Sequence, residues 1–177
     1  DICNYKKIES LFSGVECVFH LAAESRIQLA IKDPSRAISV NCLGTLNVMQ
    51  ASKKNGVKKV IYSSTSAYYG IKNKTPHKEN MERDCLNPYS VSKIAGEDII
   101  RMYQSLYGMK TTILRYYNVY GDRQPTKGRY APVIGLFKKM KNEGKKMTVV
   151  GDGLSKRDYT HVADVVNANI LASQKIK

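Results

Sequence analysis

Tyr89 and Lys93 carry the side chains best suited to chemistry, because they lie four residues apart at the start of an expected helix. The pair Asn87-Pro88 precedes them and is typical of a helix start. Since four residues make about one helical turn, the phenol and the ammonium share a face. Thr65 adds a hydroxyl at the end of an apolar run expected to be a strand. Together these groups suit proton transfer coupled to hydride transfer, which predicts an oxidoreductase-type active site.

Other interpretations of these residues stay open at this point. A tyrosine four residues before a lysine also occurs by chance in a lysine-rich chain with 12 tyrosines, and Tyr68 and Lys72 form such a pair. Gly70 lies between them in a turn-like sequence, so we do not expect them to share a helical face. Thr65 alone could be a structural hydroxyl at a strand end, and Tyr89 alone could turn its ring toward the core.

The composition is that of an ordinary globular protein. The chain has 177 residues, 42% of them hydrophobic, which is enough for one domain with a substantial core. It contains no apolar run long enough to span a bilayer, so we expect no membrane partner. The four cysteines are widely spaced and are expected to be free thiols in a reducing cytosol, which predicts a cytoplasmic protein. With three histidines and no paired ligand spacing, we expect no metal site.

The formal charge of +14 allows two interpretations. One is a surface for nucleic acid, and the other is a solvated, lysine-rich surface on an enzyme that handles anions. The lysines gather where helices are expected to end, as in 52–59 and 138–146, and they do not form one strip interleaved with aromatic residues. We therefore expect no nucleic-acid partner.

The order of the expected elements predicts the fold class. At three junctions a helical stretch ends at a glycine, and a short basic linker leads into a β-rich run; the glycines are Gly56, Gly108 and Gly144, and the last run is 145–152. A further apolar strand is expected at 15–22. Helices are expected at about 5–12, 35–55, 89–107, 132–142 and 161–173, and a surface loop at 71–86. Such alternation predicts an α/β fold with a Rossmann-like, doubly wound parallel sheet.

A fold of this kind normally begins with a glycine-rich turn that holds a dinucleotide pyrophosphate. This sequence contains neither G-x-x-G-x-x-G nor G-x-G-x-x-G, begins at Asp1 without a methionine, and stops at Lys177 directly after an expected helix. We therefore expect the chain to be the middle of a longer protein. Without the glycine-rich turn, we expect these 177 residues alone to bind the dinucleotide weakly and to be inactive.

Eight short motifs follow one another along the chain: DI at the start, HLAA, NCLGT, YSSTSAYYG, NPYSVSK, LRYYNVYGDRQ, YAPVI and GDGLSKRDYTHVAD. In this order they resemble the extended short-chain dehydrogenase/reductase family, and within it the NAD-dependent nucleotide-sugar epimerases of the UDP-glucose 4-epimerase type. The resemblance covers nearly the whole chain. It implies one partial NAD(P)-binding Rossmann-like domain over 1–177, in which about 118–160 contributes to a smaller substrate-binding region.

The resemblance also implies a role for each matching residue. The catalytic positions are those of Thr65, Tyr89 and Lys93. The positions that contact the cofactor, NAD, are Asp1, Ile2, Leu21, Ala22, Ala23, Asn41, Ser63, Tyr89, Lys93, Tyr116 and Tyr117. The positions that contact the substrate, a UDP-hexose, are Thr65, Asn118, Tyr130, Ala131 and Arg157. Helices 35–55 and 89–107 would form the interface of a homodimer.

Several of these residues also have a plainer interpretation. Arg157 could form a surface ion pair with Asp158 or Asp164, and Asn118 could be a turn residue after a strand. Asn41 is harder to explain in this way, because a polar side chain on the apolar face of a helix needs a partner.

The proposed catalytic group has a simple electrostatic rationale. A tyrosine with a pKa near 10 needs a shift of about three units, or roughly 4 kcal/mol, to act as a base near neutral pH. An ammonium about 6 Å away supplies roughly 3 kcal/mol at an effective dielectric constant of about 20, so Lys93 is expected to lower the pKa of Tyr89. Tyr89 would then take the proton of the sugar 4-hydroxyl while hydride leaves C4, with Thr65 orienting the oxygen. Return of the hydride to the other face of the 4-keto sugar gives epimerisation.

The residues after the catalytic hydroxyl favour one reaction within the family. Dehydratases of the family carry an acidic pair there, and decarboxylases keep a glutamate, whereas this chain has Ser66 and Ala67. This predicts a 4-epimerase of a UDP-hexose, with or without an N-acetyl group, over a dehydratase or decarboxylase. A non-catalytic protein that senses a nucleotide is the remaining alternative, and the complete set of Thr65, Tyr89 and Lys93 argues against it.

Overall fold

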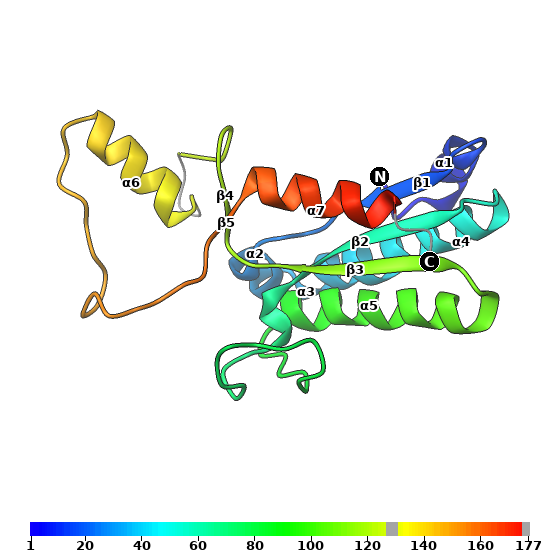
Figure 1. Cartoon of the computed structure of the whole chain (residues 1–177), viewed down its shortest axis with the longest axis horizontal. Coiled ribbons are helices and arrows are strands. Elements are labelled where there is room, and N and C mark those ends of the chain that lie inside the picture. Colours follow the sequence, from blue (N-terminus) through cyan, green and yellow to red (C-terminus); the bar gives the residue numbers. More distant parts are fainter. Residues whose placement is uncertain (127–130, 175–177) are drawn as a thin grey trace. The chain divides into compact units, whose positions relative to one another are not determined.

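The computed structural model describes residues 1–126 and 131–174 (Figure 1). The chain divides into two compact units. Unit 1 comprises Asp1–Arg115 together with the end of the chain from Asn169. Unit 2 comprises Tyr116–Ala168 and so contains the stretch 118–160. The larger sheet has three strands, and a two-stranded sheet lies in unit 2.

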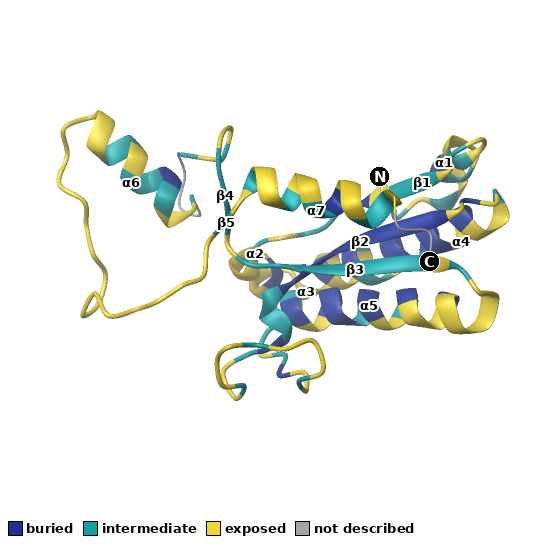
Figure 2. Ribbon diagram, viewed as in Figure 1, coloured by how far each residue is buried: buried dark blue, intermediate teal, exposed yellow. Residues whose placement is uncertain are grey.

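The three-stranded sheet confirms the expected α/β fold. Its strands are β1 (Cys17–His20), β2 (Lys59–Thr65) and β3 (Lys110–Tyr116), in the order β1-β2-β3. β1 pairs with β2 in parallel, from Cys17 opposite Lys59 to His20 opposite Tyr62. All seven residues of β2 are buried, the apolar Val60, Ile61 and Tyr62 as well as the polar residues at its two ends (Figure 2).

The helices of unit 1 include the three expected at 5–12, 35–55 and 89–107. They are α1 (Tyr5–Ile8), the 3₁₀ turn η1 (Glu9–Phe12), α2 (Ile27–Lys32), α3 (Pro34–Ile38), the π-helical turn η2 (Ser39–Leu43), α4 (Gly44–Lys54), the 3₁₀ turn η3 (Ser66–Tyr68) and α5 (Pro88–Tyr107). Of these, α2 and η3 were not expected. Because α3, η2 and α4 follow without a break, they make up the helix expected at 35–55. The stretch 71–86 has neither helix nor strand, as expected for a loop.

Helix α5 is specified at both ends by its sequence. The side chain of Asn87 accepts from the backbone N–H of Ser90, while the Ser90 hydroxyl accepts from the N–H of Asn87, so the two form a capping box around Pro88. Gly108 ends the helix with a φ of 63°, and Gly56 and Gly144 have φ values of 68° and 66°. The prediction of three left-handed glycines after helices is therefore confirmed.

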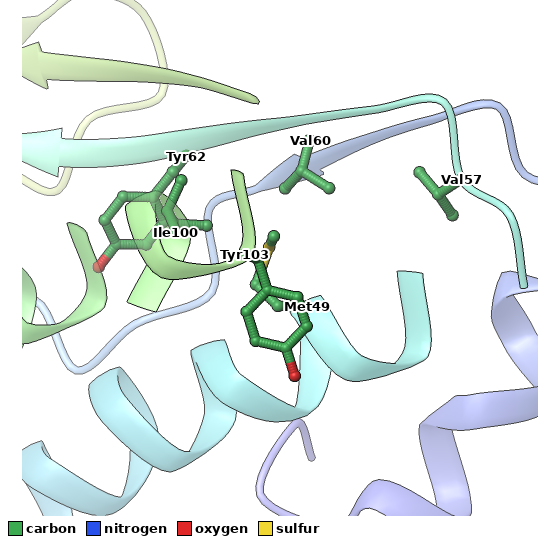
Figure 3. Packing of buried hydrophobic residues seen from close by; sticks show 6 residues of the cluster. All are labelled: Met49, Val57, Val60, Tyr62, Ile100 and Tyr103. Atoms are coloured by element: carbon green, nitrogen blue, oxygen red, sulfur yellow. The ribbon is translucent and has the colours of Figure 1, made fainter. Parts of the chain in front are cut away.

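The core of unit 1 lies where α4 and α5 pack against β2. It consists of six buried side chains, shown in Figure 3: Met49, Val57, Val60, Tyr62, Ile100 and Tyr103. Gly96 lets α5 approach the strand closely, because a Cβ at this position would lie 2.8 Å from Cζ of Tyr62 and closer still to its hydroxyl. The helix that carries Tyr89 and Lys93 is thus held directly on the strand that carries Thr65.

Unit 2 contains less regular structure. Strands β4 (Val119–Tyr120) and β5 (Thr160–His161) pair in parallel, and the helices are α6 (Val133–Asn142) and α7 (Val162–Gln174), of which α7 continues into unit 1. The expectation of a β-rich run at 145–152 is wrong, since these residues are exposed and form no strand. Their β-branched residues favour an extended chain, but a strand also needs a neighbour for its backbone hydrogen bonds.

Within the part of the chain that the structure describes, none of the helices is long and apolar enough to cross a membrane. The same residues contain no group of three or more His, Cys, Asp or Glu side chains arranged to hold a metal ion.

Candidate active site

The end of β2 and the first turn of α5 bring two of the predicted catalytic residues together. Thr65 is the last residue of β2 and is 8% exposed, and its hydroxyl accepts from the N–H of Ala67, which turns the chain into η3. Tyr89 lies in the first turn of α5 and is hydrogen bonded to the side chain of Thr65. A phenol and an alcohol from distant parts of the sequence therefore meet, as the sequence predicted.

Lys93 follows Tyr89 by one turn of α5 and is almost fully buried, with 3% exposure. Its ammonium lies over the ring of Tyr62, 4.1 Å from the ring centroid. Burial lowers the pKa of Lys93 to about 8, although the negative charge of Glu97 opposes this change. Lys93 therefore still carries its charge in most molecules at neutral pH.

The pKa of Tyr89 is not lowered as the sequence predicted. Burial of the phenol raises its pKa, and the hydrogen bond from Thr65 offsets this only in part. The charge of Lys93 is not among the causes of this pKa shift, and the Lys93 ammonium lies over the ring of Tyr62. In this structure the electrostatic argument for Lys93 is therefore wrong, because spacing in the sequence did not show how deeply both groups are buried.

Tyr62 is a member of the site that the sequence did not reveal. Besides its contact with the Lys93 ammonium, its hydroxyl donates to the backbone carbonyl of Lys93 at 3.0 Å. Burial raises the pKa of Tyr62, so it stays a neutral donor. The sequence could have indicated this role through the alternation of side chains along β2. Tyr62 and Ser64 lie two residues apart and therefore face the same side of a buried strand.

His20 ends β1 beside Tyr62, with ring centroids 5.4 Å apart. Its Nε2 lies 2.9 Å from the hydroxyl of Thr45. Burial lowers the pKa of His20 to about 3, and the charge of Lys93 adds to this effect. The imidazole is therefore neutral, and it stabilises the site by packing and hydrogen bonding.

The side chain of Asn41 forms the hydrogen bonds that a buried polar group on a helix needs. Its side-chain oxygen accepts from the N–H of Glu24 at 2.8 Å, and its amide nitrogen donates to the carbonyl of Glu24 at 3.0 Å and to the hydroxyl of Ser92 at 2.9 Å. These bonds fix the loop after β1 to α5. In that loop, Leu21 and Ala22 are exposed and Ala23 is half-buried.

Three more of the predicted cofactor positions lie in unit 1. The carboxylate of Asp1 accepts from the N–H of Cys3 at 2.9 Å. Ile2 packs against Gly44, where a Cβ would collide with its side chain, and its carbonyl accepts from the amide of Asn47 at 2.9 Å. Ser63 is buried on β2, two residues before Thr65.

In unit 2, Asn118 and Arg157 line one pocket of about 300 Å³, together with Val133, Ile134 and Tyr159, among others. Asn118 donates to the carbonyl of Asp158 at 2.8 Å, and Arg157 donates to the carbonyl of Lys156 at 2.7 Å.

Among the described residues, Arg157 forms no ion pair with Asp158 or Asp164, so the plainer interpretation of this arginine is not realised. Ala131 is half-buried and precedes Pro132, which lines the pocket. Tyr116 and Tyr117 are half-buried at the end of β3, and Tyr130 lies outside the described residues.

The chance pair Tyr68 and Lys72 does not form a second site. Tyr68 lies in η3, with the guanidinium of Arg115 3.3 Å from its ring centroid. Lys72 lies beyond Gly70, which has a φ of 56°, and its ammonium is 3.7 Å from the carboxylate of Asp84. The expectation that the two side chains do not share a helical face is confirmed.

Comparison with known protein families agrees with this arrangement. The model of the NAD dependent epimerase/dehydratase family matches residues 1–177. The chain belongs to this family. The resemblance inferred from the eight motifs is thereby confirmed, and the cofactor in the family's name, NAD, is the one that the sequence predicted.

Individual members of the family show the same relationship. The chain is 35% identical over 158 residues to a UDP-glucose 4-epimerase of Mycolicibacterium smegmatis, which is 89% of this chain and 50% of that protein. The UDP-glucose 4-epimerase of Thermotoga maritima, solved with UDP-glucose, is 38% identical with a TM-score of 0.92, over 97% of this chain and 57% of the other.

The UDP-glucose 4-epimerase of Thermus thermophilus, solved with NAD, is 33% identical with a TM-score of 0.88, over 97% of this chain and 58% of the other. The chain thus spans between 50% and 58% of the length of these relatives.

Proposed function

We propose that the whole protein is an NAD-dependent epimerase that inverts C4 of a UDP-hexose through a 4-keto intermediate. The observation that carries the proposal is the meeting of Thr65 and Tyr89, one helical turn from the buried ammonium of Lys93, in a member of the NAD dependent epimerase/dehydratase family. A nucleotide sensor would have no need of these three groups together.

The residues of unit 1 fit a dinucleotide at the carboxyl ends of the strands. Within the described residues the ammonium of Lys93 contacts the ring of Tyr62 and has no hydrogen-bond acceptor, so its N–H groups can bind the hydroxyls of a ribose. The exposed Leu21 and Ala22 follow β1 at the edge of the sheet where doubly wound folds bind their ligands. Asn41 would hold this loop in place, and Asp1, Ile2 and Ser63 would complete the cofactor site.

The proposed chemistry uses three side chains. Tyr89 removes the proton from the sugar 4-hydroxyl and returns it at the end of the reaction. Thr65, hydrogen bonded to Tyr89, orients that hydroxyl. NAD, when bound, supplies the acceptance and return of a hydride at C4. Burial raises the pKa of Tyr89 in this structure, and Lys93 does not counteract it. We propose that ligand binding lowers this pKa by bringing the charge of Lys93 to bear on the phenolate.

Unit 2 and the residues after Thr65 support the proposed substrate class. We propose that Arg157 binds the diphosphate of the nucleotide sugar, because a guanidinium binds phosphate oxygens through two parallel hydrogen bonds. Asn118 lines the same pocket and would contact the same group. Tyr130 and Ala131 would complete this region, and Tyr116 and Tyr117 would contact the cofactor. Ser66 and Ala67 carry no carboxyl group, which favours epimerisation over loss of water or carbon dioxide.

We further propose that the protein is a cytoplasmic homodimer whose interface includes 35–55 and 89–107. The support is a set of large apolar side chains that these helices leave exposed to between 41% and 65%: Ile38, Leu43, Val91, Met102 and Leu106. The four cysteines are free thiols, as a reducing compartment requires. Light scattering on the whole protein should give twice the monomer mass.

The test of the function is the product formed by the whole protein from UDP-galactose and from UDP-N-acetylgalactosamine. We expect a product of unchanged mass with C4 inverted, and we expect Tyr89→Phe to lose at least 100-fold in kcat while still binding the nucleotide sugar. A product lighter by water or carbon dioxide would favour the dehydratase or decarboxylase alternative. Tight binding with no product would favour the sensor.

A further inference from the structure

Glu97 is the one fully buried carboxylate among the described residues, and the proposed chemistry does not use it. It lies on α5 one turn beyond Lys93 and is 0% exposed. The hydroxyl of Ser64 donates to Oε1, and Arg115 binds both oxygens, with Nε 2.9 Å from Oε1 and Nη2 2.8 Å from Oε2. Arg101 adds a bond from Nη2 to Oε2 at 2.8 Å. Both oxygens are therefore satisfied by groups from three elements.

Arg115 extends this connection to the chain that follows Thr65. Its guanidinium lies 3.3 Å from the ring centroid of Tyr68 in η3. It also donates to the hydroxyl of Tyr69 at 3.2 Å and to the carbonyl of Glu79 at 3.3 Å. One arginine from β3 therefore joins α5 to η3 and to the loop 71–86.

Two of these residues lie on the elements that carry Thr65 and Tyr89. Ser64 immediately precedes Thr65 on β2, and Glu97 lies on the helix that carries Tyr89 and Lys93. We propose that Glu97, clamped by Arg115, is a positioning residue that fixes α5 against the end of β2 so that Tyr89 meets Thr65. The inference rests on the proposed function, because positioning matters only if these groups react. A displacement of about 1 Å at reacting groups can cost on the order of 100-fold in rate.

The charge of Glu97 gives this residue a second effect on the site. Burial alone would raise its pKa, but the hydrogen bonds from Arg115 and Ser64 and the charges of Arg115 and Arg101 outweigh burial, so the pKa is lowered. The carboxylate is therefore ionised at neutral pH, and it raises the pKa of Lys93 relative to burial alone.

The other titratable groups around Lys93 are Cys42 from η2, His20 from β1, Tyr62 from β2 and Tyr89 from its own helix. Of these, His20 is neutral, and burial raises the pKa of Cys42, Tyr62 and Tyr89, so they are neutral as well. Glu97 is thus the anion that supports the ammonium of Lys93.

The experiment compares Glu97→Gln with Asp98→Asn in the whole protein. Asp98 is the next residue of the same helix. It forms exposed ion pairs with Arg83 at 2.8 Å and with Arg101 at 3.6 Å, so it controls for an acid-to-amide change on α5 that also touches Arg101. We expect Glu97→Gln to lower kcat by 10- to 100-fold with KM changed less than threefold, and to move the alkaline limb of the pH–rate profile to lower pH. We expect Asp98→Asn to stay within twofold of the parent at every pH.

The pH profile separates positioning from a purely structural role. A variant that is only less stable loses activity by the same factor at all pH values, whereas loss of the anion beside Lys93 moves the limb. Wild-type kcat in Glu97→Gln, or a lower kcat with an unmoved limb, would overturn the inference while leaving the proposed function intact.

A second variant covers the case in which Glu97→Gln does not fold. Ser64→Ala removes the strand-side bond and leaves the pair of Glu97 and Arg115 in place; we expect a 3- to 10-fold loss in kcat with KM unchanged. If the parent has no activity, the proposed function fails by itself. Crystal structures of the parent and Ser64→Ala then decide the inference: separation of Tyr89 from Thr65 supports it, and an intact contact overturns it.

Discussion

Replacing Lys93 with methionine is expected to stabilise the protein at neutral pH and to remove its activity. The ammonium is 3% exposed, and burial lowers its pKa from 10.5 to about 8. At 1.36 kcal/mol per unit, keeping this group charged in the folded protein costs roughly 3 kcal/mol. Methionine has a similar length, is apolar and packs well on an aromatic ring such as that of Tyr62.

The expected gain is smaller than this cost, because the variant also loses the attraction between the ammonium and the ring of Tyr62. That attraction is worth about 0.5–2 kcal/mol, so we expect a net gain of roughly 1–3 kcal/mol in the free energy of unfolding at pH 7. This is a large fraction of the stability of a typical domain.

The sign of the pH dependence provides the sharper test. The pKa of Lys93 is lower in the folded protein than in the unfolded chain, so between pH 8 and 10.5 the unfolded chain binds more protons. The parent therefore gains stability as the pH rises through this window. The advantage of Lys93→Met should therefore shrink by roughly 2 kcal/mol between pH 7 and pH 10.

The assay is urea unfolding of the whole protein at both pH values, with the slope checked to be unchanged. Lys32→Met, at an exposed position of α2, serves as the control and should change stability by less than about 0.5 kcal/mol. A Lys93→Met protein that is less stable than the parent at pH 7 would refute the reasoning. So would a gain of the same size at pH 7 and pH 10.

Two further predictions concern the packing around the site. Gly96→Ala should lower both thermal stability and activity, by roughly 1–3 kcal/mol of unfolding free energy, because the new Cβ collides with Tyr62. Gly108→Ala, which has a φ of 63° but open space around it, should cost about 1 kcal/mol and leave kcat within twofold; equal losses of kcat in both variants would contradict the packing argument. Asp84→Ala should release the loop 71–86, because its carboxylate accepts from the N–H of Ile71 at 2.9 Å and of Lys72 at 3.1 Å. Limited proteolysis should then cut this loop faster than in the parent, and an unchanged cutting rate would show that other contacts hold it.

The features that the sequence predicted correctly are those encoded locally. The capping residues before Tyr89, the glycine after the helix and the apolar run before Thr65 specify α5 and β2 without reference to the rest of the chain. Parallel pairing of buried strands then brings their carboxyl ends to one edge of a sheet. This is why the meeting of Thr65 and Tyr89 could be predicted.

The features that were missed depend on residues far apart in sequence. The bond between Glu97 and Arg115 joins a helix to a strand 18 residues away, and neither residue has a local pattern that points to the other. The raised pKa of Tyr89 depends on how much structure covers it, which spacing does not reveal. The run at 145–152 has the composition of a strand, but composition does not supply a neighbouring strand.

The measurement that tests the central claim most directly follows deuterium placed at C4 of a UDP-hexose. If Tyr89, Thr65 and bound NAD act as proposed, NMR of the product should show C4 inverted with the deuterium still at C4, and Tyr89→Phe should slow its formation by at least 100-fold. Replacement of the deuterium by solvent hydrogen, or inversion at the parent rate in Tyr89→Phe, would contradict the account.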